Sequence, residues 1–226
     1  MFPLKDERRA FGRPTVTFAL LAVNAAICAY SLLANDVGIG RLATTAGTIP
    51  YEITHMVDIG PPAIVPLPLT MITGLFVHGG LLHLLGNMLY LWIFGPNVEG
   101  SMGHPRFAGF YLLCGFVAAF IQILVAPDGK LPIVGASGAI AGLLGAYAVL
   151  FPRARIQTLL FIRVVRVPAF ILLAGWFLLQ LSGAGQGGAV AWHAHIGGFA
   201  AGFVLARAFT ERYRYSGGGT AGARRR

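Results

Sequence analysis

The sequence predicts an all-α membrane protein built as a bundle of six transmembrane helices. The chain of 226 residues is 56% hydrophobic and only 11% charged, whereas soluble domains carry about 25% charged residues. Its mean hydropathy is +0.72. The apolar residues also fall in blocks close to the roughly 20 residues of helix that cross a bilayer. Within lipid, a helix satisfies its own backbone hydrogen bonds.

Six apolar blocks follow one another along the chain. We expect spans at 16–33, 81–94, 107–125, 134–151, 167–181 and 190–209, the second extending upstream through His78 and ending at Gly95-Pro96. The segment 35–68 is too long for a simple connection, so we expect it to have a partly embedded structure of its own. The spans form one domain at 14–210. It is preceded by the polar segment 1–13 and followed by a basic, disordered tail at 211–226.

The charges indicate how the chain crosses the membrane. The formal net charge is +9, but the basic residues concentrate at the two chain ends and in the loop Arg153–Arg166. Under the positive-inside rule both termini and this loop are cytoplasmic, and the long segment 35–68 is external. We expect a multi-pass protein of the inner (plasma) membrane. The spread of the charges argues against a nucleic-acid partner.

Polar side chains inside apolar spans are costly and tend to be functional. The strongest candidates are His78, His83, Asn87, Ser137, His193 and His195. The predicted topology places four of them, His83, Asn87, Ser137 and His195, near the external ends of their spans, so they share one depth. The weaker candidates stand alone on their spans. We interpret Gln180 as a helix-end cap, and Asn24 and Gln122 as interhelical hydrogen-bonding residues.

Helical spacing reduces this set further. His83 and Asn87 are four residues apart and share a face, whereas His78 is expected to point elsewhere. Ser137 lies among small residues, and His195 shares its face with Gly198 and Gly202. Small residues allow transmembrane helices to approach closely, so Ser137 can meet His195.

A serine hydroxyl becomes a useful nucleophile when a base takes its proton, and an imidazole can do this. Ser137 starts a helix, where free N–H groups and the helix dipole favour an oxyanion. His83 and Asn87 can add side-chain donors from the second span. We find no Asp or Glu in any predicted span, so the expected mechanism is a Ser137–His195 catalytic dyad without a metal or cofactor.

Other interpretations remain open at this stage. The segment Gly135–Gly138 is a weak signal alone, because the chain holds 31 glycines. A buried histidine can be a core residue or part of a proton path, and His83 with Asn87 can be a hydrogen-bonded clamp. The main alternative function is a His-based membrane transporter that uses His78, His83 and His195 for protons or a metal ion.

Together these motifs resemble the rhomboid intramembrane serine proteases of prokaryotes, over about residues 14–209. The segment from His78 through His83 to Asn87 is similar to the family's His-x4-His-x3-Asn pattern. Gly135-Ala-Ser137-Gly138 is similar to its nucleophile motif. His195-Ile-Gly-Gly198-Phe-Ala-Ala-Gly202 is similar to its His-x2-Gly-x3-Gly motif. The three motifs occur in the family's order on the corresponding spans.

The resemblance implies intramembrane proteolysis by a serine endopeptidase of rhomboid type. Ser137 is then the nucleophile and His195 the base, while His83, Asn87 and the Ser137 backbone N–H hold the oxyanion. The fifth span becomes a lateral gate, with Trp176 as a gate residue. The implied partners are the lipid bilayer and single-pass transmembrane protein substrates, cut near the external end of their helix.

Two positions depart from the family pattern. Some members stack a tyrosine on the catalytic histidine at the position of Ala141, and some carry a bulky gate residue at the position of Gly86. Base orientation and gating are therefore expected to differ in detail. A noncatalytic rhomboid-like binding protein is a further alternative, although such a protein would be expected to lack the serine or the histidine.

Overall fold

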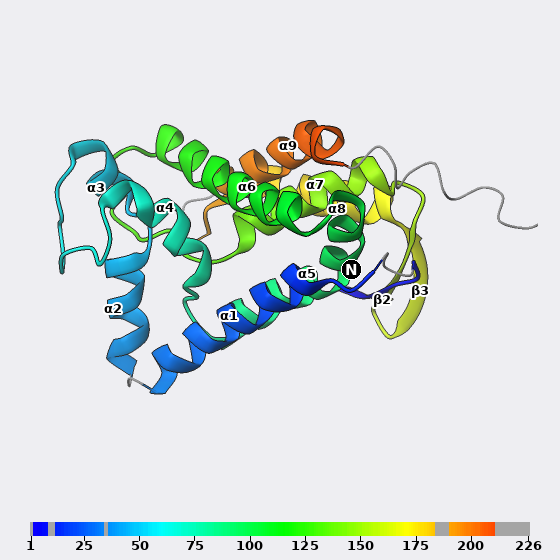
Figure 1. Ribbon diagram of the computed structural model, residues 1–226, viewed down its shortest axis with the longest axis horizontal. Coiled ribbons are helices and arrows are strands. Elements are labelled where there is room, and N and C mark those ends of the chain that lie inside the picture. The colour runs from blue at the N-terminus through cyan, green and yellow to red at the C-terminus, as the bar shows by residue number, and fades with distance from the viewer. Residues whose placement is uncertain (1, 9–11, 34–35, 184–189, 211–226) are drawn as a thin grey trace, which may run out of the picture.

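The computed structural model of the chain describes residues 2–8, 12–33, 36–183 and 190–210. The tail at 211–226, predicted to be disordered, lies outside these residues. Six longer helices make up most of the described structure (Figure 1). They are α1 (Thr15–Leu33), α5 (Leu81–Met102), α6 (His104–Val125), α7 (Ser137–Leu150), α8 (Ala169–Gly183) and α9 (Trp192–Phe209). Each overlaps one of the predicted apolar spans.

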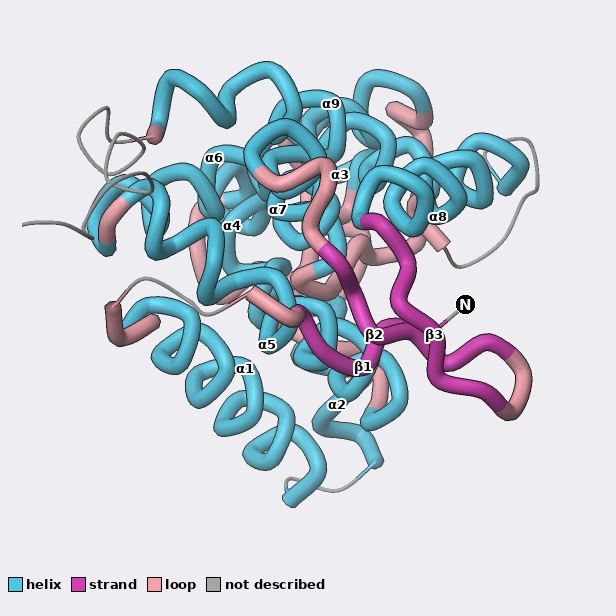
Figure 2. The backbone as a smooth tube through the Cα atoms, turned by 90° about the vertical axis from the view of Figure 1, so that its right-hand side faces the viewer, coloured by secondary structure: helices cyan, strands magenta, loops and turns pink. Residues whose placement is uncertain are grey.

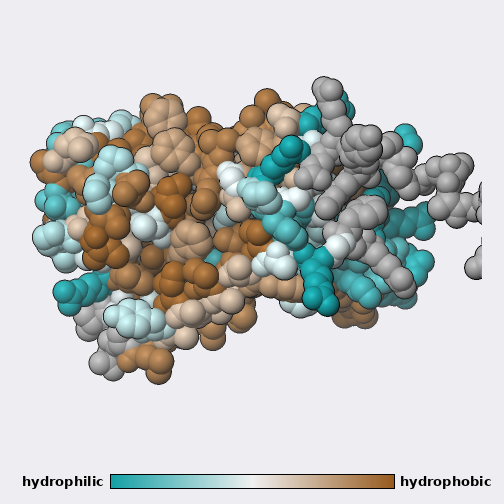
Figure 3. Space-filling view, in the orientation of Figure 1, coloured by the Kyte–Doolittle hydropathy of each residue, from teal (hydrophilic) through white to brown (hydrophobic). Residues whose placement is uncertain are grey.

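The outer surfaces of these helices are strongly apolar. Leu82 of α5 and Val204 of α9 expose 86% and 76% of their surface, and Figure 3 shows a broad hydrophobic region between more hydrophilic ends. By length and composition α1 and α6 are long enough to cross a membrane. Leu67–Phe76 together with α5 forms a third candidate, bent by 80°, and α7 and α8 are shorter apolar helices. The chain is therefore a helical membrane protein. The count of six spans and the side of the termini stay predictions.

Helix α7 is the core of the bundle. Eleven of its 14 residues are buried, and it packs against α5, α6, α8 and α9. At its C-terminal end the ring of Tyr147 is fully buried, 4.9 Å from the ring of Phe94 on α5. A helix enclosed on all sides by its neighbours gives its first residue, Ser137, a fixed position.

Two expectations about the second span are wrong. The span does not continue upstream as one helix, because the chain turns through 80° before α5 and Gly80 adopts a φ of +154°. At its other end α5 passes through Pro96 and ends at Met102. A proline inside a helix costs about 3 kcal/mol. The packing of residues 97–102, all of them buried, offsets that cost.

Continuation of α5 also places an acid inside the bundle. Glu99, expected in a loop, is 1% exposed. Its carboxylate accepts hydrogen bonds from the N–H groups of Val16 and Thr17, from the Thr17 hydroxyl and from His104 Nδ1. It thereby caps the N-terminus of α1, where free N–H groups favour a negative charge. The expectation that no acid lies in a span is wrong, although Glu99 sits at the opposite end of α5 from His83.

A three-stranded antiparallel sheet lies at one end of the bundle, here called the sheet end (Figure 2). It consists of β1 (Phe2–Asp6), β2 (Arg155–Leu160) and β3 (Arg163–Pro168) in the order β1-β2-β3. The fold is therefore not all-α. The missed signal is the period-two alternation of a strand: Ile156 and Thr158 are fully buried, whereas Arg155, the first residue of β2, is exposed.

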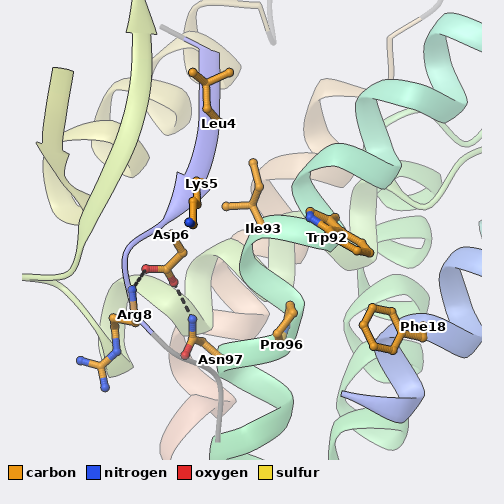
Figure 4. Close-up of a pocket in the computed structure, with 9 residues that line it drawn as sticks. All are labelled: Leu4, Lys5, Asp6, Arg8, Phe18, Trp92, Ile93, Pro96 and Asn97. Carbon is orange, nitrogen blue, oxygen red and sulfur yellow. Dashed lines mark hydrogen bonds between the residues drawn. The ribbon is translucent and has the colours of Figure 1, made fainter. Parts of the chain in front are cut away.

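Asp6 attaches the N-terminal strand to the helices. Its carboxylate accepts hydrogen bonds from the backbone N–H of Arg8 (2.9 Å), from Asn97 Nδ2 (2.6 Å) and from the Tyr147 hydroxyl. Figure 4 shows the first two of these bonds at the edge of a cavity of about 210 Å³. Burial raises the pKa of the Asp6 carboxyl above its ordinary value, while the three hydrogen bonds oppose that rise. The sheet is thus joined to α5 and, through Tyr147, to α7.

The long segment between α1 and α5 contains short helices; that it is partly embedded in the membrane stays a prediction. They are α2 (Asp36–Ala46), α3 (Pro50–His55), η1 (Leu67–Leu69), α4 (Thr70–Thr73) and η2 (Gly74–Phe76). Thr48 pairs with Ile133 in an isolated β-bridge, and the carbonyl of Gly74 accepts a 2.9 Å hydrogen bond from Gly135 N–H. The segment therefore supports the loop that precedes Ser137.

The attachment through Asp6 predicts a specific loss of stability. In Asp6→Ala, the buried side chains of Asn97 and Tyr147 lose their acceptor. Each buried polar group left unsatisfied costs about 1–3 kcal/mol, so the melting temperature of the detergent-solubilised protein should fall clearly. The control is Glu7→Gln, which removes the half-exposed ion pair with Arg166 and should cost about 1 kcal/mol or less. Equal melting temperatures for the two variants would contradict this role of Asp6.

Candidate active site

Ser137 is the first residue of α7, at the end opposite the sheet. The turn before it requires glycine at position 135, where φ is +112°, because side chains strongly disfavour that region. Ala136 is fully buried and its carbonyl accepts the first hydrogen bond of the helix, from Ile140 N–H. The N–H groups of the first turn have no partner within the helix. A negative charge that develops beside Ser137 therefore meets free donors.

Ser137 and His195 lie within hydrogen-bonding distance. His195, near the start of α9, places its Nε2 2.8 Å from Ser137 Oγ. The contact depends on the close approach of two helices: a Cβ on Gly202 would overlap the Gly142 carbonyl, and one on Gly198 would overlap the Gly138 carbonyl. Glycines on facing positions thus let the backbones of α7 and α9 touch, as small residues do in membrane helices.

Gln180 is a third member of this arrangement that the sequence reasoning missed. Its Nε2 donates to the Trp176 carbonyl at 3.3 Å, and its Oε1 lies 2.8 Å from His195 Nδ1. Because an amide oxygen only accepts, Nδ1 carries the proton and Nε2 is the basic nitrogen that faces Ser137. The residue was interpreted as a helix-end cap. The signal that could have revealed this role was the position of Gln180, a polar side chain at the same predicted depth as Ser137 and His195.

Two side chains of α5 approach the loop before Ser137. A Cβ on Gly135 would lie 2.6 Å from His83 Nε2 and 3.3 Å from Asn87 Nδ2, so both side chains lie directly against this glycine. Within the described structure, Asn87 Nδ2 is a buried donor without a hydrogen-bond partner. An unpaired buried donor is costly. Asn87 lies against Gly135, two residues before Ser137. This position suits an acceptor that is present only during a reaction.

His78 is also close to this group, contrary to expectation. The ring centroids of His78 and His83 are 5.2 Å apart in an edge-on contact. Helical spacing does not relate the two residues, because the chain bends between them. In the part of the chain that the structure describes, both His78 ring nitrogens lack a hydrogen-bond partner. No group of three or more His, Cys, Asp or Glu side chains suited to a metal ion occurs there either.

Two tryptophans flank the imidazole of His195. The ring centroids of Trp176 on α8 and Trp192 on α9 each lie 6.2 Å from it. Ala141, where some rhomboid proteases carry a stacking tyrosine, is fully buried. The ring of His195 is therefore oriented by the Gln180 hydrogen bond and by neighbouring indoles. On α5, a Cβ added at Gly86 would have no neighbouring atom within 4 Å.

The remaining polar candidates have structural roles. Gln122 on α6 accepts a hydrogen bond from Ala194 N–H at the start of α9, an interhelical bond as predicted. Asn24 instead donates to the Leu20 carbonyl within its own helix, so its predicted interhelical role is wrong. His193 is half-buried on the first turn of α9.

Comparison with known proteins identifies a family. The model of the Rhomboid domain matches residues 68–212. RHOMBOID-like protein 5 of Arabidopsis thaliana is 34% identical over 145 residues, 64% of this chain and 45% of that protein. The mitochondrial Rhomboid protein 1 of Saccharomyces cerevisiae is 32% identical over 139 residues, 58% of this chain and 38% of the relative.

A more distant match is the mitochondrial Presenilin-associated rhomboid-like protein of Bos taurus, 31% identical over 107 residues, 46% of this chain and 27% of that protein. The chain thus spans less than half the length of these relatives. All three are eukaryotic proteins. They therefore do not support the prediction that the chain resembles the prokaryotic members of the family in particular.

The close approach of α7 and α9 predicts that a single methyl group destabilises the protein. In Gly202→Ala, the new Cβ overlaps the backbone of Gly142, and backbone cannot move aside as a side chain can. Overpacking of this kind costs about 1–3 kcal/mol. The matched control is Gly109→Ala on α6, where nothing lies within 4 Å of the Cβ position, and where alanine favours the helix. A melting temperature for Gly202→Ala at or above that of Gly109→Ala would refute the packing.

Proposed function

The chain belongs to the Rhomboid domain family, and from this premise we propose that it is an intramembrane serine endopeptidase. Its substrates are single-pass transmembrane proteins, cleaved near the external end of their helix through an acyl-enzyme. The observation that carries the proposal is the 2.8 Å approach of His195 Nε2 to Ser137 Oγ. A nucleophile and a base at this distance are what covalent catalysis by serine requires.

The reaction begins with proton transfer from Ser137 to His195. As Oγ attacks the scissile carbonyl carbon, its proton passes to Nε2, and the resulting imidazolium keeps its Nδ1–H on Gln180 Oε1. The imidazolium then gives a proton to the departing amine, which leaves an ester on Ser137. Water, deprotonated by the same nitrogen, attacks the ester and releases the acid.

The tetrahedral intermediates carry a negative charge on the former carbonyl oxygen. The Ser137 backbone N–H, the unpaired Asn87 Nδ2 and the His83 ring are the donors available around Gly135. Donors already in place stabilise the oxyanion without reorganisation during the reaction. The site thus draws its nucleophile from α7, its base from α9 and its oxyanion donors from α5 and α7.

Substrate helices are proposed to enter sideways from the lipid past α8. This helix packs on α7, α9 and β3, and the half-buried ring of Trp176 has its centroid 6.2 Å from that of His195, which supports Trp176 as the gate residue. Its other face carries exposed apolar side chains, among them Leu178 and Leu179. Displacement of α8 would open a path to Ser137. The proposed orientation has six spans and cytoplasmic termini in the inner (plasma) membrane.

Two alternatives make different predictions. A noncatalytic rhomboid-like binding protein would bind transmembrane segments without cleaving them. A transporter based on His78, His83 and His195 would not need Ser137. The second is weakened because His195 is occupied on both ring nitrogens, by Ser137 and by Gln180.

Removal of either reacting group should abolish cleavage. The purified chain, reconstituted in vesicles, should cut a model single-pass substrate, and Ser137→Ala or His195→Ala should lower kcat by about four orders of magnitude or more. Gel analysis and mass spectrometry of the fragments measure this. The control is His193→Ala, two residues from the base on the same helix, which should retain cleavage. Cleavage at the parent rate by Ser137→Ala would reject the proposal, as would a parent chain that binds the substrate but leaves it intact.

Loss of the Gln180 hydrogen bond should affect the chemical step more than substrate binding. Gln180→Leu removes the acceptor that holds Nδ1–H, and one hydrogen bond of about 1.4 kcal/mol corresponds to about tenfold in kcat. KM should stay near the parent value. Gln180→Glu, which keeps an oxygen acceptor, should recover much of the loss. Leu178→Val, on the exposed face of the same helix, is the control. An unchanged kcat for Gln180→Leu would show that Gln180 does not position the base.

A further inference from the structure

The turn between β2 and β3 exposes large apolar side chains. Phe161 and Ile162 are 92% and 93% exposed, and Phe161 adopts a φ of +53°. Figure 2 shows the β2–β3 hairpin extending sideways from the sheet end, with its turn beyond the outline of the helices. Two fully exposed apolar residues at the tip of a projecting hairpin are costly in water. The tip therefore offers an apolar surface on which a partner could be accommodated.

The exposed apolar surface continues from the turn onto the sheet. In the strand register Leu159 pairs with Phe2 on β1 and with Val164 on β3. These three side chains are 36%, 52% and 58% exposed. The apolar residues of the hairpin thus gather toward the tip. On its face toward the bundle, β2 buries Ile156 and Thr158.

Basic side chains lie along the hairpin behind this apolar tip: Arg163 directly follows the turn, whereas Arg155 pairs with Pro168 at the root of the hairpin. Arg155, Arg163 and Arg166 are all exposed, and residues 151–169 contain no Asp or Glu. Arg166 forms an ion pair with Glu7, 2.7 Å long, in which the arginine stays 64% exposed. Asp6, the residue before Glu7, is buried and accepts hydrogen bonds from Asn97 on α5 and Tyr147 on α7. The outer surface of the hairpin is therefore cationic as well as apolar.

The position of the hairpin selects the partner. β3 ends at Pro168 and α8 begins at Ala169, and the next residues, Phe170 and Ile171, are exposed apolar side chains of that helix. The apolar surface that faces lipid thus starts where the hairpin ends. A six-residue strand is about 20 Å long, so the hairpin reaches sideways over the headgroups of the adjoining leaflet. Anionic lipids attract basic side chains at that level, and apolar side chains enter the boundary with the acyl chains.

We propose that the β2–β3 hairpin is a membrane anchor, with Phe161 and Ile162 inserted into the leaflet at the sheet end and its arginines on anionic lipid headgroups. The anchor holds the sheet against the bilayer. Because β3 continues directly into α8, it also ties the position of that helix to the lipid. The proposal rests on the membrane character of the chain and is independent of proteolysis.

The test places a reporter at the turn. Phe161→Cys is labelled with a polarity-sensitive fluorophore and reconstituted in vesicles of phosphatidylcholine with phosphatidylglycerol. The unsubstituted chain is the blank, since Cys28 and Cys114 are buried. The matched control is Gln157→Cys, on the same strand but four residues before Phe161 and nearer the root of the hairpin. Nitroxide groups on the upper acyl chain report contact with lipid, and aqueous iodide reports contact with water.

The anchor predicts a blue-shifted label at position 161 that nitroxide lipids quench and iodide does not. The label at 157, farther from the turn, should be quenched less by nitroxide lipids and more by iodide than the label at 161. Removal of phosphatidylglycerol, or the double change Arg155→Gln and Arg163→Gln, should weaken the nitroxide quenching at 161. Quenching at 161 by iodide alone would overturn the proposal. Shielding from both quenchers, with cross-linking between copies through position 161, would overturn it in favour of a protein interface.

Discussion

The direct contact between the backbones of α7 and α9 is the constraint on which the site depends. Gly142 and Gly202, with Gly138 and Gly198 one turn away, leave no room for a side chain between the helices. Ser137 and His195 come from positions 58 residues apart in sequence. They meet only because these glycines remove the usual spacing between helix axes. The surrounding helices contribute by fixing α7, which is buried along nearly its whole length.

Much of this arrangement was predictable from composition and spacing. Apolar blocks located five of the six longer helices to within about three residues at each end, as hydropathy does for lipid-facing chains. The sixth, α5, starts as predicted but runs eight residues beyond the predicted end at 94. Shared depth and small-residue faces selected Ser137, His195, His83 and Asn87, which the structure brings to one place. These predictions succeed because lipid permits few backbone structures and because a charged or polar residue in a span has few explanations.

The failures have equally specific causes. The positive charge at residues 153–166 was interpreted only as evidence that this loop is cytoplasmic. Ile156 and Thr158, however, alternate with outward residues as in a strand. Pro96 suggested a helix end, whereas the packing of residues 97–102 carries α5 onward to Glu99. Gln180 was missed because sequence alone does not show that α8 crosses α9 beside His195. The strand was a local signal that was overlooked, whereas the continuation of α5 and the role of Gln180 depend on tertiary packing that local signals do not show.

The account holds that His195 activates Ser137 as a nucleophile. A fluorophosphonate reacts covalently with activated serine hydroxyls, and peptide mass spectrometry of the reconstituted chain locates the adduct. The account predicts modification of Ser137, at a rate that falls to background in His195→Ala while Ser101, buried at the other end of the bundle, stays unmodified. Modification of another serine, or of Ser137 at the same rate without His195, would contradict it.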